Sequence, residues 1–131
     1  MNEVTRLQDI EDMPPVAAHP YCHGVVAEGK FLFISGQGPW DPALGEFPRG
    51  TISEQTRLTL ECLGRVMREA GATPADIVSV RVYLQPLNSQ TWAEMNVEFE
   101  KFFEGHKPSR TAIGCTLVDI DVEMDAVFRV P

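Results

Sequence analysis

The fold is decided by residues 78–117, which run VSVRVYLQPLNSQTWAEMNVEFEKFFEGHKPSRTAIGCTL. Residues 78–84 alternate valine or leucine with more polar side chains, which is the period of a strand that buries one face. A helix follows, capped by either Asn88 or Thr91, because the apolar residues after these positions recur at helical spacing. Gly105 ends this helix, and β-prone residues resume soon after it. The segment therefore predicts a strand, a helix and another strand in succession.

A similar alternation precedes that segment. Two short β-like runs, residues 23–28 and 31–35, are separated by Gly29 in a pattern typical of a hairpin. A capping box that begins at Thr51 predicts another helix, because its hydroxyl and the carboxylate three positions later satisfy free N–H groups of the first turn. Gly71 supplies the stop signal of this helix.

The remaining segments complete an α+β fold. Residues 1–20 favour an extended arm or an edge strand, and residues 36–50, rich in glycine and proline, favour a loop. Two strands close the chain, residues 111–117 and 120–130, and we expect them to form a hairpin. The two helices most simply pack on one face of the resulting mixed sheet. Residues 1–131 are expected to form a single domain.

The composition argues against several classes of function. The chain has 131 residues, of which 44% are hydrophobic and 23% charged, as in an ordinary globular protein. Its net charge of −8 and scattered basic residues argue against nucleic acid as a partner, because phosphate binding needs clustered Lys and Arg. No stretch approaches the roughly 20 apolar residues of a membrane span, and no signal peptide is recognisable. The three widely spaced cysteines predict neither disulfides nor a zinc site, so we expect a cytoplasmic protein.

The last strand predicts a surface that the helices do not cover. Its alternate residues divide into an apolar set and a mixed set. The apolar set is Val122, Met124, Ala126, Phe128 and Val130, and the mixed set is Glu123, Asp125, Val127 and Arg129. Two helices cover one sheet face, so the mixed set faces water or another subunit. Because such a mixture suits a subunit interface with a polar site, we expect a homo-oligomer.

Arg110 and Glu123 are the candidate catalytic residues. Arg110 follows Pro108 and begins a strand, so its planar guanidinium is aimed and can hold a carboxylate through two hydrogen bonds. Glu123, on the neighbouring strand of the expected hairpin, can act as a general base or orient a water. Two alternatives stay open: Arg110 as an ordinary surface arginine, and Glu123 as a structural partner of Arg110 or Arg81.

The carboxylates of the same region do not predict a metal site. Asp119, Asp121, Glu123 and Asp125 are expected to lean toward one strand face, about 6–7 Å apart. A straight strand spreads such side chains and cannot gather four oxygens around one cation. We therefore expect a solvated acidic turn at Asp119 and Asp121 that leads into Glu123. The histidines share no motif and are expected in loops or at strand ends: His19, His23 and His106.

Short motifs occur in order along nearly the whole chain. They are Pro20-Tyr21, Phe33-Ile34-Ser35-Gly36-Gln37, Asn96 followed by Phe102-Phe103, Pro108-Ser109-Arg110, and Val122-Glu123-Met124. Together they resemble the RidA/YjgF family of reactive-intermediate deaminases. The resemblance implies a chorismate-mutase-like α+β subunit that assembles as a homotrimer, with three sites between subunits. It also implies hydrolysis of 2-imino acids, or their enamine tautomers, to 2-oxo acids and ammonia without a cofactor.

The resemblance also assigns roles to individual residues. Arg110 would hold the carboxylate of a small metabolite, and Glu123 would position and activate the attacking water. The remaining contacts to the substrate would come from the side chains of Tyr21, Ser35 and Asn96 and from the backbone N–H groups of Gly36 and Ala112. Ala112 stands where the family commonly has a cysteine, and residues 117–119 form a shorter connection than the usual Leu-Pro turn. Trp40, in the glycine-rich loop, can narrow the cleft.

Other functions are compatible with the same residues. A pathway-specific deaminase of an aminomuconate-like dicarboxylate would need a second cation, for which Arg81 or Arg129 could serve. A non-catalytic trimer could bind carboxylates in the same cleft. Ribonuclease activity, ascribed to relatives, is the least supported because the acidic chain offers no phosphate-binding patch.

Overall fold

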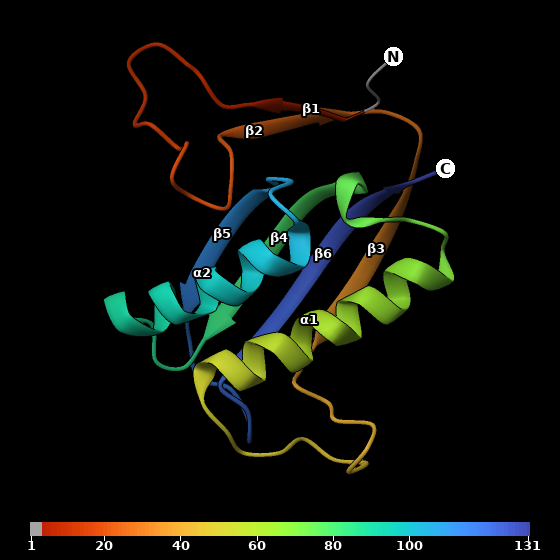
Figure 1. Cartoon of the computed structure of the whole chain (residues 1–131), viewed down its shortest axis with the longest axis vertical. Coiled ribbons are helices and arrows are strands. Elements are labelled where there is room, and N and C mark those ends of the chain that lie inside the picture. Colours follow the sequence, from red (N-terminus) through yellow and green to blue (C-terminus); the bar gives the residue numbers. More distant parts are fainter. Residues whose placement is uncertain (1–3) are drawn as a thin grey trace.

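A computed structural model of the chain describes residues 4–131 (Figure 1). The elements in that range are β1 (Val4–Leu7), β2 (Gly24–Ala27), β3 (Lys30–Gln37), α1 (Ile52–Glu69), the 3₁₀-helix η1 (Pro74–Asp76), β4 (Ile77–Leu84), α2 (Ser89–Phe103), β5 (Ser109–Gly114) and β6 (Val122–Val130). Both predicted helices are confirmed. Thr51 forms the expected capping box of α1, and of the two cap residues weighed for α2 the structure uses Asn88.

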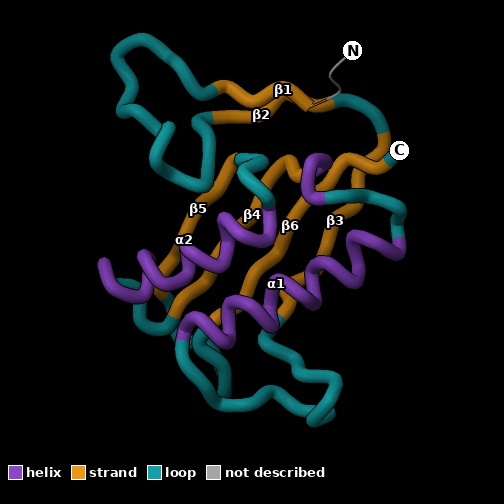
Figure 2. The backbone as a smooth tube through the Cα atoms, viewed as in Figure 1, coloured by secondary structure: helices purple, strands orange, loops and turns teal. Residues whose placement is uncertain are grey.

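The main sheet has four strands in the order β3–β6–β4–β5, and it is mixed. β6 runs antiparallel to both β3 and β4, whereas β5 runs parallel to β4. α1 connects β3 to β4 and α2 connects β4 to β5, so both connections cross in the same direction along the sheet. Because such crossovers are almost always right-handed, both helices lie on the same face, as Figure 1 and Figure 2 show. The prediction of two helices on one face of a mixed sheet is confirmed.

The predicted hairpin between the last two strands is wrong. β5 lies at the edge of the sheet, and β4 separates it from β6. One face of β6 is strongly apolar, and its Val122, Met124 and Phe128 side chains are fully buried. Between β3 and β4 this face is covered by the helices, whereas an outer position beyond β5 would leave more of it in water. Burial of β6 therefore determines the strand order.

A second sheet consists of β1 and β2 alone, which pair antiparallel (Figure 1). The predicted hairpin around Gly29 is therefore also wrong, because β2 pairs with β1 while β3 pairs with β6. β1 confirms an edge strand within the first 20 residues, of which residues 1–3 lie outside the described range. Arg6 ties this sheet to the main body, since its Nε donates to the Lys107 carbonyl at 2.9 Å and its Nη2 to the Ala75 carbonyl at 2.9 Å.

The hydrophobic core lies between the main sheet and the two helices. Its fully buried side chains include Leu63, Ile77, Val82, Leu84, Met95, Phe99, Phe103, Val122, Met124 and Phe128. Within residues 4–131 no element covers the opposite sheet face, where Phe33 is 75% exposed and Ile113 is 38% exposed. No helix of the described range is long and apolar enough to cross a bilayer. The uncovered face carries the kind of apolar surface that commonly marks an interaction site.

The start of α2 depends on a reciprocal cap. Asn88 Oδ1 accepts a hydrogen bond from the Thr91 N–H at 2.9 Å, and Thr91 Oγ1 accepts one from the Asn88 N–H at 3.0 Å. We predict that Asn88→Ala lowers the free energy of unfolding by about 1 kcal/mol, because the Thr91 N–H loses its acceptor. Urea denaturation measures the change. Ser89→Ala, the neighbouring control, should change it by less than about 0.5 kcal/mol; equal losses in the two variants would contradict the prediction.

Candidate active site

Arg110 lies at the start of β5 and points toward α2. It pairs in register with Val80, a buried residue on the helix-covered face of the sheet. Its Nη1 donates a hydrogen bond to Asn96 Oδ1 at 2.7 Å. Its guanidinium carbon lies 4.9 Å from the centre of the Tyr21 ring and 4.8 Å from that of Phe99. The guanidinium is thus held in place by α2 and by aromatic rings, unlike the side chain of an ordinary surface arginine.

This guanidinium is a desolvated cation. Burial lowers the pKa of Arg110 to about 10, with the phenol of Tyr21 acting in the opposite direction, so the group stays charged at neutral pH. Its hydrogen bonds to Asn96 and to Met95 Sδ both come from Nη1. No carboxylate of residues 4–131 lies within ion-pair distance of it. Because an unpaired buried charge is costly, the site favours an anionic ligand that can use the remaining N–H donors.

Aromatic side chains missed by sequence reasoning surround this cation. The guanidinium carbon of Arg110 lies 5.9 Å from the Trp92 ring centre. His19 stacks on Tyr21, with ring centres 5.2 Å apart, and meets the Trp92 ring edge-on at 5.9 Å. The sequence motifs do not include Trp92, and the sequence predicts His19 only in a loop or at a strand end. The available signal was spacing, since Trp92 lies four positions before Asn96 and therefore on the same helix face.

Glu123 lies on the opposite face of the sheet. Its neighbours along β6, Val122 and Met124, are buried under the helices, so the Glu123 side chain points to the uncovered face. It pairs in register with Tyr83 of β4. On its other side is Gly36 of β3, where an added Cβ would lie 2.6 Å from Glu123 Oε2. The Glu123 carboxylate therefore lies against the backbone of Gly36, and it would have to move if position 36 carried a side chain.

Asp125, and not Glu123, is the partner of Arg81. Arg81 Nε donates to Asp125 Oδ1 at 2.9 Å, and the Tyr83 hydroxyl donates to Asp125 Oδ2 at 3.1 Å. The hydrogen bond from Arg81 to Asp125 raises the pKa of Arg81. The pKa of Tyr83 is also raised, mainly by desolvation and then by the hydrogen bond from its own hydroxyl to Asp125. Among the residues described, Glu123 forms no ion pair. The alternative of Glu123 as a structural partner of Arg110 or Arg81 is wrong within this subunit.

The structure thus divides the predicted site residues into two groups. The group on the helix-covered face comprises Tyr21, Asn96, Arg110 and Ala112. The group at the uncovered face and its edge comprises Ser35, Gly36 and Glu123. The expectation that a hairpin brings Arg110 and Glu123 together is wrong, because β4 lies between their strands and the two side chains leave the sheet on opposite faces. One subunit alone does not bring the two groups together.

The expected row of four carboxylates on one strand face is also wrong. Asp121 precedes β6, and its Oδ2 accepts a hydrogen bond from Gln55 Nε2 of α1 at 3.0 Å. Its backbone N–H donates to Gln55 Oε1 at 2.8 Å, so Asp121 anchors the turn to α1 instead of leading into the site. Asp119 has a φ of 62°, a left-handed turn conformation. In the part of the chain that the structure describes, no group of three or more potential metal ligands gathers.

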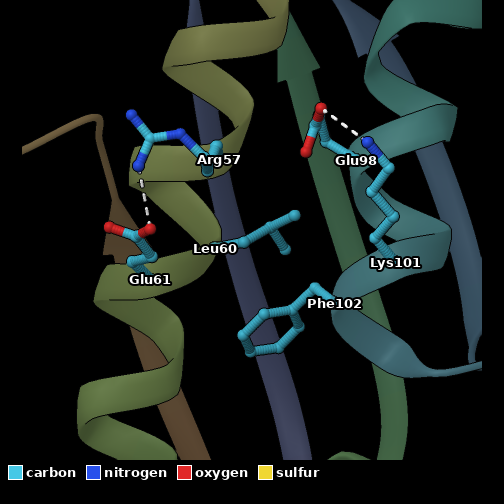
Figure 3. A pocket seen from close by; sticks show the side chains of 6 residues that line it. All are labelled: Arg57, Leu60, Glu61, Glu98, Lys101 and Phe102. Carbon is cyan, nitrogen blue, oxygen red and sulfur yellow. Dashed lines mark hydrogen bonds and ion pairs between the residues drawn. The ribbon is translucent and has the colours of Figure 1, made fainter.

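A groove between α1 and α2 holds none of the predicted site residues (Figure 3). Leu60 and Phe102 form its apolar lining. Its charged residues are paired within each helix: Arg57 with Glu61 at 2.9 Å, and Lys101 with Glu98 at 3.5 Å. With its cations neutralised, this groove lacks the unpaired charge that distinguishes the surroundings of Arg110.

Similarity to known proteins identifies the family of this chain. A family model described as Endoribonuclease L-PSP matches residues 12–130. The chain is a member of this family, the RidA/YjgF family. A RutC family protein of Pyrococcus abyssi is 37% identical over 115 residues, which is 86% of this chain and 88% of the relative. The 2-iminobutanoate/2-iminopropanoate deaminase of Escherichia coli is 32% identical over 118 residues, covering 86% of this chain and 89% of the relative.

The RidA/YjgF fold is equally clear from solved structures. The crystal structure of YyfB, a Rid family protein from Yersinia pestis, matches with a TM-score of 0.85 at 27% identity, covering 98% of this chain and 100% of that one. The chain therefore has the chorismate-mutase-like fold of its family, as the sequence motifs had implied.

The desolvation of Arg110 makes a prediction about stability. Because burial lowers its pKa below that of the unfolded chain, the charged form is disfavoured in the fold, and this cost is relieved as pH rises through about 10. We predict that Arg110→Met raises the free energy of unfolding at pH 7 by about 1–3 kcal/mol. Thermal unfolding should show the gain as a higher Tm.

Arg57→Met is the matched control, since it removes the same charge from an exposed pair on α1. It should change stability by no more than about 0.5 kcal/mol. A lower Tm for Arg110→Met than for the unaltered protein would show that its aromatic and Asn96 contacts outweigh the desolvation.

Proposed function

We propose that this protein hydrolyses 2-imino acids, or their enamine tautomers, to 2-oxo acids and ammonia. The observation that carries the proposal is the desolvated guanidinium of Arg110, which has unused N–H donors and no carboxylate partner among residues 4–131. A substrate carboxylate supplies the missing anion. The 32% identical deaminase of Escherichia coli, named for 2-iminobutanoate and 2-iminopropanoate, supports substrates of this size and charge.

The proposed site is shared between subunits of a homotrimer. Arg110 and Glu123 leave opposite faces of one sheet, so a substrate that touches both takes them from different copies of the chain. The uncovered sheet face supports this assembly, because Phe33 and Ile113 expose apolar surface there beside Glu123 and Tyr83. A closed ring of three copies would bury this surface at three equivalent interfaces.

In the proposed reaction each residue has one role. Arg110 holds the carboxylate of the imino acid, while Asn96 and the ring of Tyr21 keep the guanidinium in position. Glu123 of the neighbouring subunit accepts a proton from a water as the water oxygen bonds to the imine carbon, and it returns this proton to the nitrogen, which gives an amino alcohol. Glu123 then transfers the proton of the new hydroxyl to the nitrogen, the carbon–oxygen double bond of the 2-oxo acid forms, and the carbon–nitrogen bond breaks to release ammonia. The backbone N–H groups of Gly36 and Ala112 and the hydroxyl of Ser35 are further donors to the substrate. No cofactor takes part in this sequence.

Activity is tested on imino acids that are generated within the assay mixture. An amino-acid oxidase generates 2-iminobutanoate, and the rate of ammonia release is measured with and without this protein. We predict clear acceleration by the unaltered chain and a loss of at least about a hundredfold in both Arg110→Ala and Glu123→Gln. Arg57→Ala, which lies in no predicted site, should keep full activity.

The outcome also separates the proposal from its alternatives. Binding of 2-oxobutanoate in calorimetry without any acceleration would favour a non-catalytic carboxylate-binding trimer. A strong preference for a dicarboxylate imine would favour the aminomuconate-like alternative.

Mixed assemblies test whether the site is shared. Co-expression of Arg110→Ala with Glu123→Gln gives mixed trimers. A site in such a trimer is intact when its Arg110 comes from a Glu123→Gln chain and its Glu123 comes from an Arg110→Ala chain. Each of these two conditions is met with a chance of one half, so we predict recovery of about a quarter of full activity. Arg110→Ala co-expressed with the double variant should stay inactive. If the first mixture is equally inactive, the two residues do not act across an interface.

A further inference from the structure

A cavity on the helix side of β3 shares only Gly36 with the two groups of site residues. Its volume is about 390 Å³, and it lies between α1 and the loop that follows β3. The residues that line it are Gly36, Gln37, Gly38, Trp40, Phe47, Cys62, Arg65 and Val66. This volume falls in the usual range of small-molecule sites. The cavity is also separate from the groove in Figure 3, with which it shares no residue.

Two aromatic rings form the outer wall of this cavity. The Trp40 and Phe47 rings meet edge to face, with centres 5.1 Å apart, and 39% of Trp40 and 49% of Phe47 are exposed. Gly38 permits this arrangement, since an added Cβ would lie 3.2 Å from Phe47 and 3.1 Å from Ile120. Exposed rings that face a cavity offer a stacking surface for a planar group.

Arg65 supplies a positive charge to the lining of the same cavity. Arg65 is exposed on α1, and its Nη1 donates to Cys62 Sγ at 3.4 Å. Within the described residues no carboxylate lies in ion-pair range of Arg65, in contrast to Arg57 on the same helix. The Cys62 thiol is engaged with the Trp40 carbonyl at 3.7 Å. An unpaired guanidinium beside an aromatic wall is complementary to an aromatic ring that carries a carboxylate.

We propose that this cavity is a second binding site, for a small aromatic carboxylate whose ring packs on Trp40 and Phe47 and whose carboxylate meets Arg65. The site is distinct from the surface that carries Glu123, because α1 and Glu123 lie on opposite faces of the sheet. Gly36 alone belongs to both, since it lines the cavity and also lies under the Glu123 carboxylate. The second site does not depend on the proposed deaminase activity, and it can be tested by binding alone.

The chain provides its own reporter. Trp40 and Trp92 are its two tryptophans, so Trp92→Phe leaves Trp40 as the only tryptophan fluorophore. In this background we titrate 3-phenylpropanoate, with 3-phenylpropan-1-ol as the uncharged analogue, and record the emission of Trp40. We expect a saturable change with 3-phenylpropanoate and binding at least about tenfold weaker for the alcohol, which lacks the charge-assisted hydrogen bonds.

Three further variants locate the ligand. Arg65→Gln should weaken 3-phenylpropanoate binding about tenfold or more, whereas Arg68→Gln, which removes the same charge from the last turn of α1, should not. Arg110→Ala should leave the titration unchanged, because Arg110 belongs to the other site. Unchanged binding in Arg65→Gln, loss of binding in Arg110→Ala, or competition by 2-oxobutanoate would overturn the proposal. So would an absence of saturation.

Discussion

The position of β6 between β3 and β4 is the constraint on which the rest of the structure depends. Both helical connections cross in the same direction, so α1 and α2 share one face of the sheet, and within residues 4–131 the other face is bare. β6 then presents its apolar residues to the helices and Glu123 to the bare face, between Gly36 and Tyr83. Arg110, on the outer strand β5, points to the helices instead. The separation of Arg110 and Glu123 within one subunit, on different strands and opposite sheet faces, follows directly from this strand order.

Arg110, the proposed carboxylate-binding residue, is held in place despite the cost of its desolvation. Aromatic rings of Tyr21, Trp92 and Phe99 surround its guanidinium, and Asn96 accepts one hydrogen bond. The rings attract the cation but also exclude water, which lowers its pKa. A fold selected only for stability would pair or replace such a charge. In the proposed function, the carboxylate of the substrate replaces the interactions with water that Arg110 loses on burial.

Several features of the site were accessible from sequence, and others were not. Asn96 was named from the family motif, and helical spacing from it points to Trp92 and Phe99. His19 carried no such signal, because it reaches Tyr21 and Trp92 only when the loop before β2 folds back on α2. Asp121 resembled its neighbours Asp119 and Glu123 in the alternating pattern. Its bonds to Gln55 on α1 remove it from that row, and Gln55 is 66 residues away in the chain.

The sequence by itself determined the helices, most of the strands, the apolar face of the last strand and the family. These depend on periodicity, caps and short motifs, which act within a few residues. Only the tertiary structure decided which strands pair, and both hairpins expected from sequence proximity were wrong. Strand pairing depends on where the most apolar strand is best covered and on the hand of the crossovers, and neither is a local property. For the same reason only the folded chain places Arg110 and Glu123 on opposite faces of one sheet.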